Sequence, residues 1–171
     1  MNLLQALNKG YSILKSSNIG SYKIDTELIL CQSLNISREE LILNLNKRIN
    51  FKEYTEFQKK IERRKAKEPV AYILERKEFW KNEFYISENV LIPRPESEHL
   101  IEETLKLIKK NQSKKLLEIG IGSGCLIISI LKERINCFGT GIDCSEKALK
   151  IANFNANLHQ IQNRIKILKT D

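Results

Sequence analysis

The central feature of this sequence is the stretch 116–124, which reads Leu116-Leu117-Glu118-Ile119-Gly120-Ile121-Gly122-Ser123-Gly124. An apolar run ends at Ile119, three glycines follow at alternate positions, and a helix-like pattern begins at Ser123. Glycines in such a turn permit tight curvature and close approach of a ligand, and the first turn of the next helix offers N–H groups to polar ligand atoms. The stretch therefore predicts a strand, a ligand-binding loop and a helix in succession.

The same alternation continues on either side of the glycines. We expect strands over 115–119, 137–142 and 165–168, and helices over 123–132 and 145–158. A β-α-β-α-β order requires right-handed crossovers and produces a parallel sheet. At the start of the last helix, Ser145 is interpreted as a helix cap rather than a catalytic group.

The glycine spacing separates one class of cofactor from others. A dinucleotide fingerprint would place its third glycine at position 125, where Cys125 stands, and no Gly-Lys-Ser/Thr follows, so a phosphate-cradling loop is absent. The second strand ends at Asp143, 23 residues after Gly120, which suits a carboxylate that accepts hydrogen bonds from ribose hydroxyls. The pattern Glu-x-Gly-x-Gly-x-Gly resembles motif I of the Rossmann-like S-adenosylmethionine-dependent methyltransferases.

The first 67 residues have a helical pattern. Apolar residues at 3, 7, 11 and 14 share one helix face, and capping boxes begin at Ser37 and Asn50. Beyond Pro69, the aromatic and β-branched residues of 77–86 around Asn82 predict a hairpin. The two prolines of 93–95 then force an extended segment, and a helix over 96–110 is expected to turn Leu100, Ile101, Leu105 and Ile108 inward.

Composition narrows the class of protein. The chain has 171 residues, 42% hydrophobic and 29% charged, which excludes collagen-like and disordered chains. It has neither an apolar run long enough to span a membrane nor a secretory signal pattern. The net charge of +8 is spread evenly, and the densest basic cluster, 59–67, is interpreted as a solvated helix face rather than a nucleic-acid site.

The cysteines point to a reducing compartment. Cys31, Cys125, Cys137 and Cys144 form no Cys-x-x-Cys pair and lie inside apolar runs. We therefore interpret them as small core residues, expect neither a disulfide nor a metal site, and predict a cytoplasmic protein.

Further segments extend the likeness to a particular family. The runs Glu68-Pro-Val-Ala-Tyr-Ile-Leu74, Glu78-Phe-Trp80 and Val90-Leu-Ile-Pro-Arg-Pro-Glu-Ser-Glu98, with the region from Asp143 to Ala156, resemble the PrmC/HemK family. The family consists of protein-(glutamine-N5) methyltransferases that act on peptide chain release factors. The resemblance covers nearly the whole chain, and Ile-Pro-Arg-Pro-Glu-Ser-Glu is its most specific part.

The resemblance implies three parts and a reaction. These are a helical release-factor-docking domain over 1–70, a β-hairpin linker over 71–95, and the first part of a Rossmann-like methyltransferase domain over 96–171. The implied cofactor is S-adenosyl-L-methionine, and the implied acceptor is the side-chain amide of the glutamine in a release factor's Gly-Gly-Gln loop.

The resemblance also implies site residues. The glycine loop would cradle the methionine end of the cofactor, Asp143 would hold its ribose, and Asp171 would lie near its adenine. Three linker residues, Arg94, Glu96 and Glu98, would brace the site. The full set of implied cofactor contacts is Glu118, Gly120, Ile121, Gly122, Ser123, Gly124, Asp143 and Asp171.

There are two departures from the family. Glu75 stands where the family has glycine in a turn, so a side chain alters the backbone angles available there. The catalytic Asn-Pro-Pro-Tyr segment, which follows a fourth strand in the family, is absent from these 171 residues, so no catalytic residue is named. We therefore expect part of a longer enzyme that lacks activity alone, binds the cofactor weakly, and exposes apolar surface and an edge of its sheet.

Two other functions remain open. The pI of about 9.3 is compatible with a methyltransferase acting on tRNA or rRNA, although the Ile-Pro-Arg-Pro linker argues against it. A non-catalytic module that only holds a partner is the second alternative. Comparing methyl transfer to RNA with methyl transfer to a release factor, using the complete enzyme, would distinguish an RNA methyltransferase from a release factor methyltransferase. The missing Asn-Pro-Pro-Tyr segment keeps the non-catalytic module open.

Overall fold

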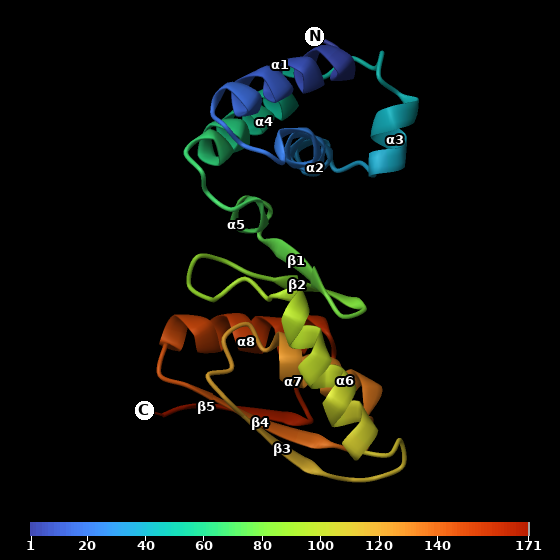
Figure 1. Cartoon of the computed structure of the whole chain (residues 1–171), viewed down its shortest axis with the longest axis vertical. Helices are drawn as coiled ribbons and strands as arrows, with labels where there is room; N and C mark the ends of the chain where they lie inside the picture. The colour runs from blue at the N-terminus through green and yellow to red at the C-terminus, as the bar shows by residue number, and fades with distance from the viewer. Residues whose placement is uncertain (171) are drawn as a thin grey trace. The chain divides into compact units, whose positions relative to one another are not determined.

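The computed structural model describes residues 1–170, and the chain divides into two compact units, Met1–Leu74 and Glu75–Asp171. The first unit is helical, as Figure 1 shows. It contains α1 (Leu3–Ser16), α2 (Tyr22–Leu34), α3 (Arg38–Leu43), α4 (Phe51–Lys65) and α5 (Val70–Leu74). The predicted helical bundle is confirmed.

Capping boxes set where three of these helices begin. The side chains of Asn2, Ser37 and Asn50 each accept a hydrogen bond from the third residue of the following helix. Such caps satisfy backbone N–H groups that have no partner inside the helix. The boxes predicted at Ser37 and Asn50 are therefore present, and they start α3 and α4.

The core of the first unit follows the predicted helix face. In α1 the side chains of Leu3, Leu7 and Leu14 are buried, and they pack in one cluster with Phe57 and Ile61 of α4. Burial of a large apolar side chain contributes about 1.5–3 kcal/mol to stability. Contacts between α1, α2 and α4 therefore hold the bundle together.

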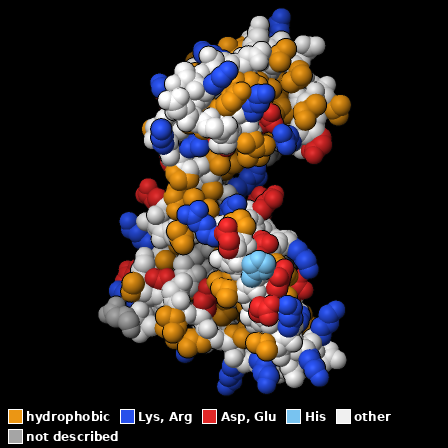
Figure 2. Space-filling model, in the orientation of Figure 1, with side chains coloured by type: hydrophobic (Ala, Val, Ile, Leu, Met, Phe, Trp, Pro, Cys, Tyr) orange, Lys and Arg blue, Asp and Glu red, His pale blue; other side chains and the backbone are white. Residues whose placement is uncertain are grey.

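Ion pairs occupy much of the basic cluster 59–67. Lys59 pairs with Glu56, Lys65 with Glu62, and Arg63 with Glu68. Figure 2 shows Lys and Arg side chains scattered over both units on the face that is drawn, without one continuous basic patch. These pairs support the interpretation of the cluster as a solvated helix face.

The helical unit ends at Leu74, four residues beyond the expected boundary at residue 70. Helix α5 belongs to the first unit, because Ile73 and Leu74 are buried in its core and Gln32 Nε2 donates a hydrogen bond to Leu74 O at 2.6 Å. The hairpin is not a separate linker either. Phe79 and Phe84 are buried in the core of the second unit, so the hairpin belongs to that unit.

The second unit contains the hairpin and the three-stranded sheet. Its elements are β1 (Arg76–Phe79), β2 (Asn82–Tyr85), the 3-10 helix η1 (Pro95–Ser97), α6 (Glu98–Leu107), β3 (Lys115–Ile119), α7 (Cys125–Glu133), β4 (Phe138–Asp143), α8 (Glu146–Leu158) and β5 (Ile165–Lys169). The strands β3, β4 and β5 are adjacent in that order and parallel. The predicted α/β class with a parallel, Rossmann-like sheet is confirmed.

The helices of the second unit cover one face of this sheet. Leu116, Ile165 and Ile167 pack against the core cluster that contains α7 and α8. On the opposite face, Ile119, Ile142 and Leu168 align in one row of the register. Ile119 is 77% exposed, Leu117 64% and Leu168 40%, so the expectation of exposed apolar surface is confirmed.

Several local expectations are wrong. Asn82 is the first residue of β2 rather than the turn, which contains Trp80 in a left-handed conformation (φ 49°). Leu100 is 60% exposed because Ile101 takes the inward position of α6. Cys144 is exposed, because it follows the end of β4, whereas Cys31, Cys125 and Cys137 are buried.

Among residues 1–170, no helix combines the length and apolar character needed to cross a bilayer.

Candidate functional site

The three loop glycines all adopt left-handed backbone conformations, with φ of 72° at Gly120, 53° at Gly122 and 78° at Gly124. A side chain would strain the backbone at each of these positions. A Cβ on Gly120 would meet no atom within 4 Å, whereas one on Gly124 would lie 2.9 Å from Ile128 Cδ1. Gly120 therefore leaves open space beside the loop, and Gly124 permits close packing against α7.

Asp143 ties the loop to the start of α8. Its Oδ2 accepts a hydrogen bond from Gly122 N at 3.0 Å, and its Oδ1 accepts one from Ser145 N at 2.9 Å. Ser145 in turn caps α8 through Ala148 N, as the sequence predicts. Each carboxylate oxygen has a further lone pair, so the same group can accept hydrogen bonds from ligand hydroxyls.

The loop is also attached to β4. The amides of Gly120 and Ile121 both donate to Ile142 O at 2.9 Å. Gly141, on the neighbouring strand, lies where a Cβ would be 2.1 Å from Ile121 Cδ1. Glycine at 141 is therefore required for Ile121 to pack beneath the loop, which keeps the loop close to the carboxyl end of the sheet.

Glu118 is a carboxyl group on the helix-covered side of β3. Its Oε2 accepts a hydrogen bond from Ile127 N at 3.1 Å, in the first turn of α7. Burial raises the pKa of Glu118 from its ordinary value to about 7, and the hydrogen bond from Ile127 opposes this increase. A cationic ligand group near this carboxyl would favour its charged form.

Asn155 makes a polar contact to the loop, and the sequence pattern had assigned this residue no role in the site. It is fully buried in α8, and its side chain reaches Ser123 O and both backbone polar groups of Tyr85. A sequence signal existed, because Asn155 shares the buried face of α8 with Ala148, Ala152 and Ala156.

The linker residues are placed differently from one another. Glu98 Oε1 accepts a hydrogen bond from Trp80 N at 2.7 Å, so this carboxylate braces the hairpin. Arg94 and Glu96 are exposed, and no hydrogen bond or ion pair within residues 1–170 joins either of them to the glycine loop. Asp171, the expected adenine contact, lies outside the described residues.

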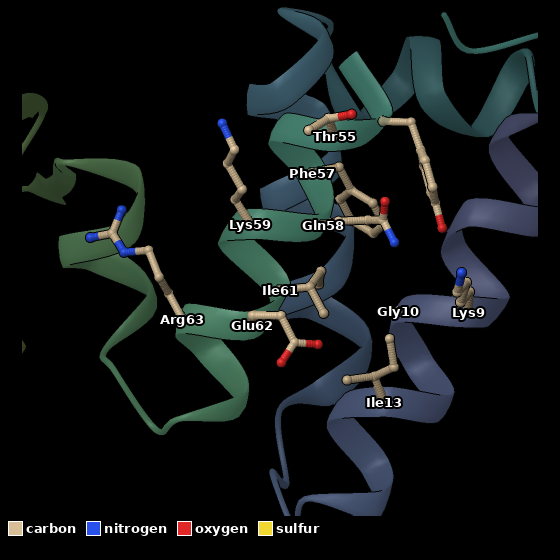
Figure 3. Close-up of a pocket in the computed structure, with 11 residues that line it drawn as sticks. Lys9, Gly10, Ile13, Thr55, Phe57, Gln58, Lys59, Ile61, Glu62 and Arg63 are labelled. Carbon is tan, nitrogen blue, oxygen red and sulfur yellow. The ribbon is translucent and has the colours of Figure 1, made fainter. Parts of the chain in front are cut away.

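A groove lies between α1 and α4 in the helical unit, as Figure 3 shows, with a volume of about 520 Å³. Ile13 of α1 and Ile61 of α4 come from the two facing helices, and Phe57 lies one turn before Ile61 in α4. The buried hydroxyl of Tyr54, which also lines the groove, has no hydrogen-bond partner in the described part of the chain. The exposed surface of the groove is mainly apolar, and Lys9 and Lys59 are also among its lining residues.

This geometry defines the class of the second unit. A parallel sheet, a glycine loop that leaves space at Gly120, and a carboxylate at the end of the next strand characterise a Rossmann-like cofactor-binding domain. The glycine spacing places it with the methyltransferase type rather than the dinucleotide type.

Two of the known sequences that resemble this chain share one name. Residues 5–74 match the PrmC N-terminal domain. The release factor glutamine methyltransferase of Caulobacter vibrioides is 32% identical over 171 residues, which are 100% of this chain and 59% of that protein. The protein of the same name from Coxiella burnetii is 38% identical over 82% of this chain and 51% of its own length. The predicted resemblance to the PrmC/HemK family is thereby confirmed.

The chain spans between about a third and three-fifths of the length of the curated relatives it matches. Among solved structures, a SAM-dependent methyltransferase from Geobacter sulfurreducens in complex with S-adenosyl-L-homocysteine is 24% identical. The likeness covers 46% of this chain and 30% of that one, with a TM-score of 0.39.

Proposed function

We propose that this chain takes part in the S-adenosylmethionine-dependent methylation of the glutamine side-chain amide in release factors. The observation that carries the proposal is the left-handed glycine loop tied through Gly122 N to the Asp143 carboxylate. Similarity to a release factor glutamine methyltransferase over all 171 residues of this chain supports the acceptor. A release factor acts in translation, so we also propose a cytoplasmic location.

The residues of the loop fit S-adenosylmethionine. Open space beside Gly120 supports binding of the methionine end there, and the lone pairs left on the Asp143 carboxylate support hydrogen bonds from ribose hydroxyls. The partly buried Glu118 carboxyl lies on the strand that leads into the loop and contacts Ile127 N, and a cationic group of the cofactor near it would stabilise its ionised form. When bound, the cofactor supplies an electrophilic methyl group for in-line displacement, and the chain's contribution is positioning and electrostatic stabilisation.

Calorimetric titration of the 171-residue chain with S-adenosylhomocysteine tests the cofactor site. We expect Asp143→Ala and Gly120→Val to weaken binding at least tenfold, which corresponds to about 1.4 kcal/mol. Gly20→Ala is the matched control, because a Cβ there would meet no atom within 4 Å. Absence of binding by the unaltered chain, or equal binding by the loop variants, would contradict the proposed site.

We also propose that the helical unit docks the release factor through the α1–α4 groove. The apolar side chains that line the groove favour burial of apolar side chains from a partner. The groove lies within residues 5–74, the part that matches the PrmC N-terminal domain.

Pull-down of purified release factor by the full chain tests the docking proposal. Ile13→Glu places a charge on the apolar floor, so it should abolish capture. Ile24→Glu is the matched control, because Ile24 is 36% exposed in α2 and does not line the groove. Equal capture by the two variants would exclude the groove, and capture of tRNA instead of release factor would favour an RNA substrate.

A further inference from the structure

One side chain links three segments of the second unit that are distant in sequence. Asn155, fully buried in α8, accepts a hydrogen bond at Oδ1 from Tyr85 N at 2.8 Å. Its Nδ2 donates to Tyr85 O and to Ser123 O, both at 2.9 Å. The side chain therefore joins the hairpin strand β2 to the glycine loop.

The amide chemistry of asparagine is well matched to this position. Its two N–H donors serve two carbonyls, and its oxygen serves one backbone N–H. A serine side chain has one donor, and an alanine side chain has none. Because a buried backbone group without a partner is costly, any smaller residue leaves either Tyr85 or Ser123 unsatisfied.

The contact at Ser123 also sets the orientation of a loop peptide. Ser123 O belongs to the peptide that ends in Gly124 N, and that N–H donates to Ile121 O at 2.8 Å. The peptide is therefore held on both sides, by Asn155 at its carbonyl and by Ile121 at its N–H. Gly124, at one end of this peptide, and Gly122, one residue before Ser123, are in left-handed conformations, so the fixed peptide plane contributes to the curvature of the loop.

We propose that Asn155 is a positioning residue that holds the glycine loop in its cofactor-binding curvature and couples it to the hairpin. The role in cofactor binding rests on the proposed function, whereas the coupling of loop and hairpin does not. Binding of a ligand at the loop should then slow hydrogen exchange in β2. Loss of the Asn155 contact to β2 should speed hydrogen exchange in the loop.

Hydrogen exchange of the 171-residue chain without cofactor tests the coupling first. Asn155→Ala and the milder Asn155→Ser should both speed exchange at residues 121–125 and at 83–86. Asn153→Ala is the matched control, because Asn153 lies on the exposed side of the same helix. Leu149→Ala is a stability control, because Leu149 is a buried core residue of α8 whose apolar side chain cannot form a hydrogen bond to the loop.

S-adenosylhomocysteine provides the second part of the test. In the unaltered chain we expect the ligand to slow exchange at both 121–125 and 83–86. In Asn155→Ser it should bind about tenfold more weakly, and any protection should stay confined to the loop. Leu149→Ala should lower Tm while keeping both the affinity and the paired protection.

The outcomes separate the two proposals. If the unaltered chain binds no S-adenosylhomocysteine, the proposed function fails, and the ligand-free exchange still decides whether Asn155 couples loop and hairpin. If Asn155→Ser changes exchange and affinity no more than Leu149→Ala does at equal loss of Tm, Asn155 is only a packing residue and the inference is overturned.

Discussion

Glu118 makes the second unit sensitive to pH near neutrality. Burial beside α7 raises the pKa of its carboxyl to about 7, above the ordinary value of 4.5. The folded state therefore binds this proton more tightly than the unfolded state does. The associated stability is fully present below pH 4.5 and is lost as the pH rises through 7.

We expect Glu118→Gln to flatten the pH dependence of stability. Between pH 5 and 8, the free energy of unfolding of the unaltered chain should fall by roughly 1–3 kcal/mol more than that of the variant. Urea unfolding at several pH values measures this difference. Glu88→Gln, at an exposed position, should keep the slope of the unaltered chain, and identical slopes for Glu118→Gln and the unaltered chain would contradict the assignment.

Glu75 illustrates strain at a single backbone position. Its φ of 54° lies in the left-handed region, and its carbonyl accepts a hydrogen bond from Ile86 N at 3.2 Å. This agrees with the sequence argument that a turn there favours glycine. The side chain is exposed, so nothing in packing offsets the unfavourable conformation.

Glu75→Gly should therefore stabilise the chain by about 1 kcal/mol. Thermal unfolding followed by circular dichroism gives the measurement. Glu78→Gly is the control, because Glu78 lies within β1, where glycine weakens a strand. If both substitutions destabilise the chain, the strain at residue 75 is absent.

At the scale of elements, a nearly buried ion pair joins α2 to α4. Arg64 Nε donates to Asp25 Oδ2 at 2.7 Å, and the two side chains are 16% and 5% exposed. Ser21 Oγ donates to the same carboxylate oxygen at 2.6 Å, and Arg64 Nη1 donates to Glu68 O. The pair therefore belongs to a network whose members depend on one another.

Removal of one partner should be costly, because it leaves the other charge buried and unpaired. We expect Asp25→Ala to lower the free energy of unfolding by about 3 kcal/mol. Glu56→Ala, which removes the exposed partner of Lys59, should have no measurable effect. Denaturant titration compares the two variants, and equal effects would show that the α2–α4 pair is not a structural tie.

At the scale of the whole molecule, the open face of the sheet is an exposed apolar surface. Leu117 and Ile119 are 64% and 77% exposed on β3, which is an edge strand among the described strands. Exposed apolar rows beside an unpaired strand edge favour association between copies.

We expect the 171-residue chain to self-associate with rising concentration, and Leu117→Lys to reduce this association. Sedimentation velocity over a range of concentrations provides the measurement. Leu43→Lys is the control, because Leu43 is 82% exposed but lies in α3 of the helical unit. A monomer at every concentration, or an equal effect of both substitutions, would exclude the sheet face as the cause.

The local sequence pattern was sufficient to predict many of the helices and strands of this protein. Hydrophobic periodicity and capping boxes located α1, α3 and α4, and the strand–glycine–helix alternation located β3, α7, β4, α8 and β5 within a few residues. These features depend on interactions between residues close in sequence, which is why a single chain reveals them. The glycine loop and Asp143 followed from the same local spacing.

Contacts between segments that are distant in the chain could not be predicted from the sequence. Asn155 meets Tyr85 across 70 positions and Ser123 across 32, and only the fold brings them together. The same holds for the end of the helical unit at Leu74, which depends on Gln32, and for the pKa of Glu118, which depends on burial by α7. Burial and long-range hydrogen bonds are properties of the packed molecule, whereas helix starts, turns and glycine conformations are set within a few neighbouring residues.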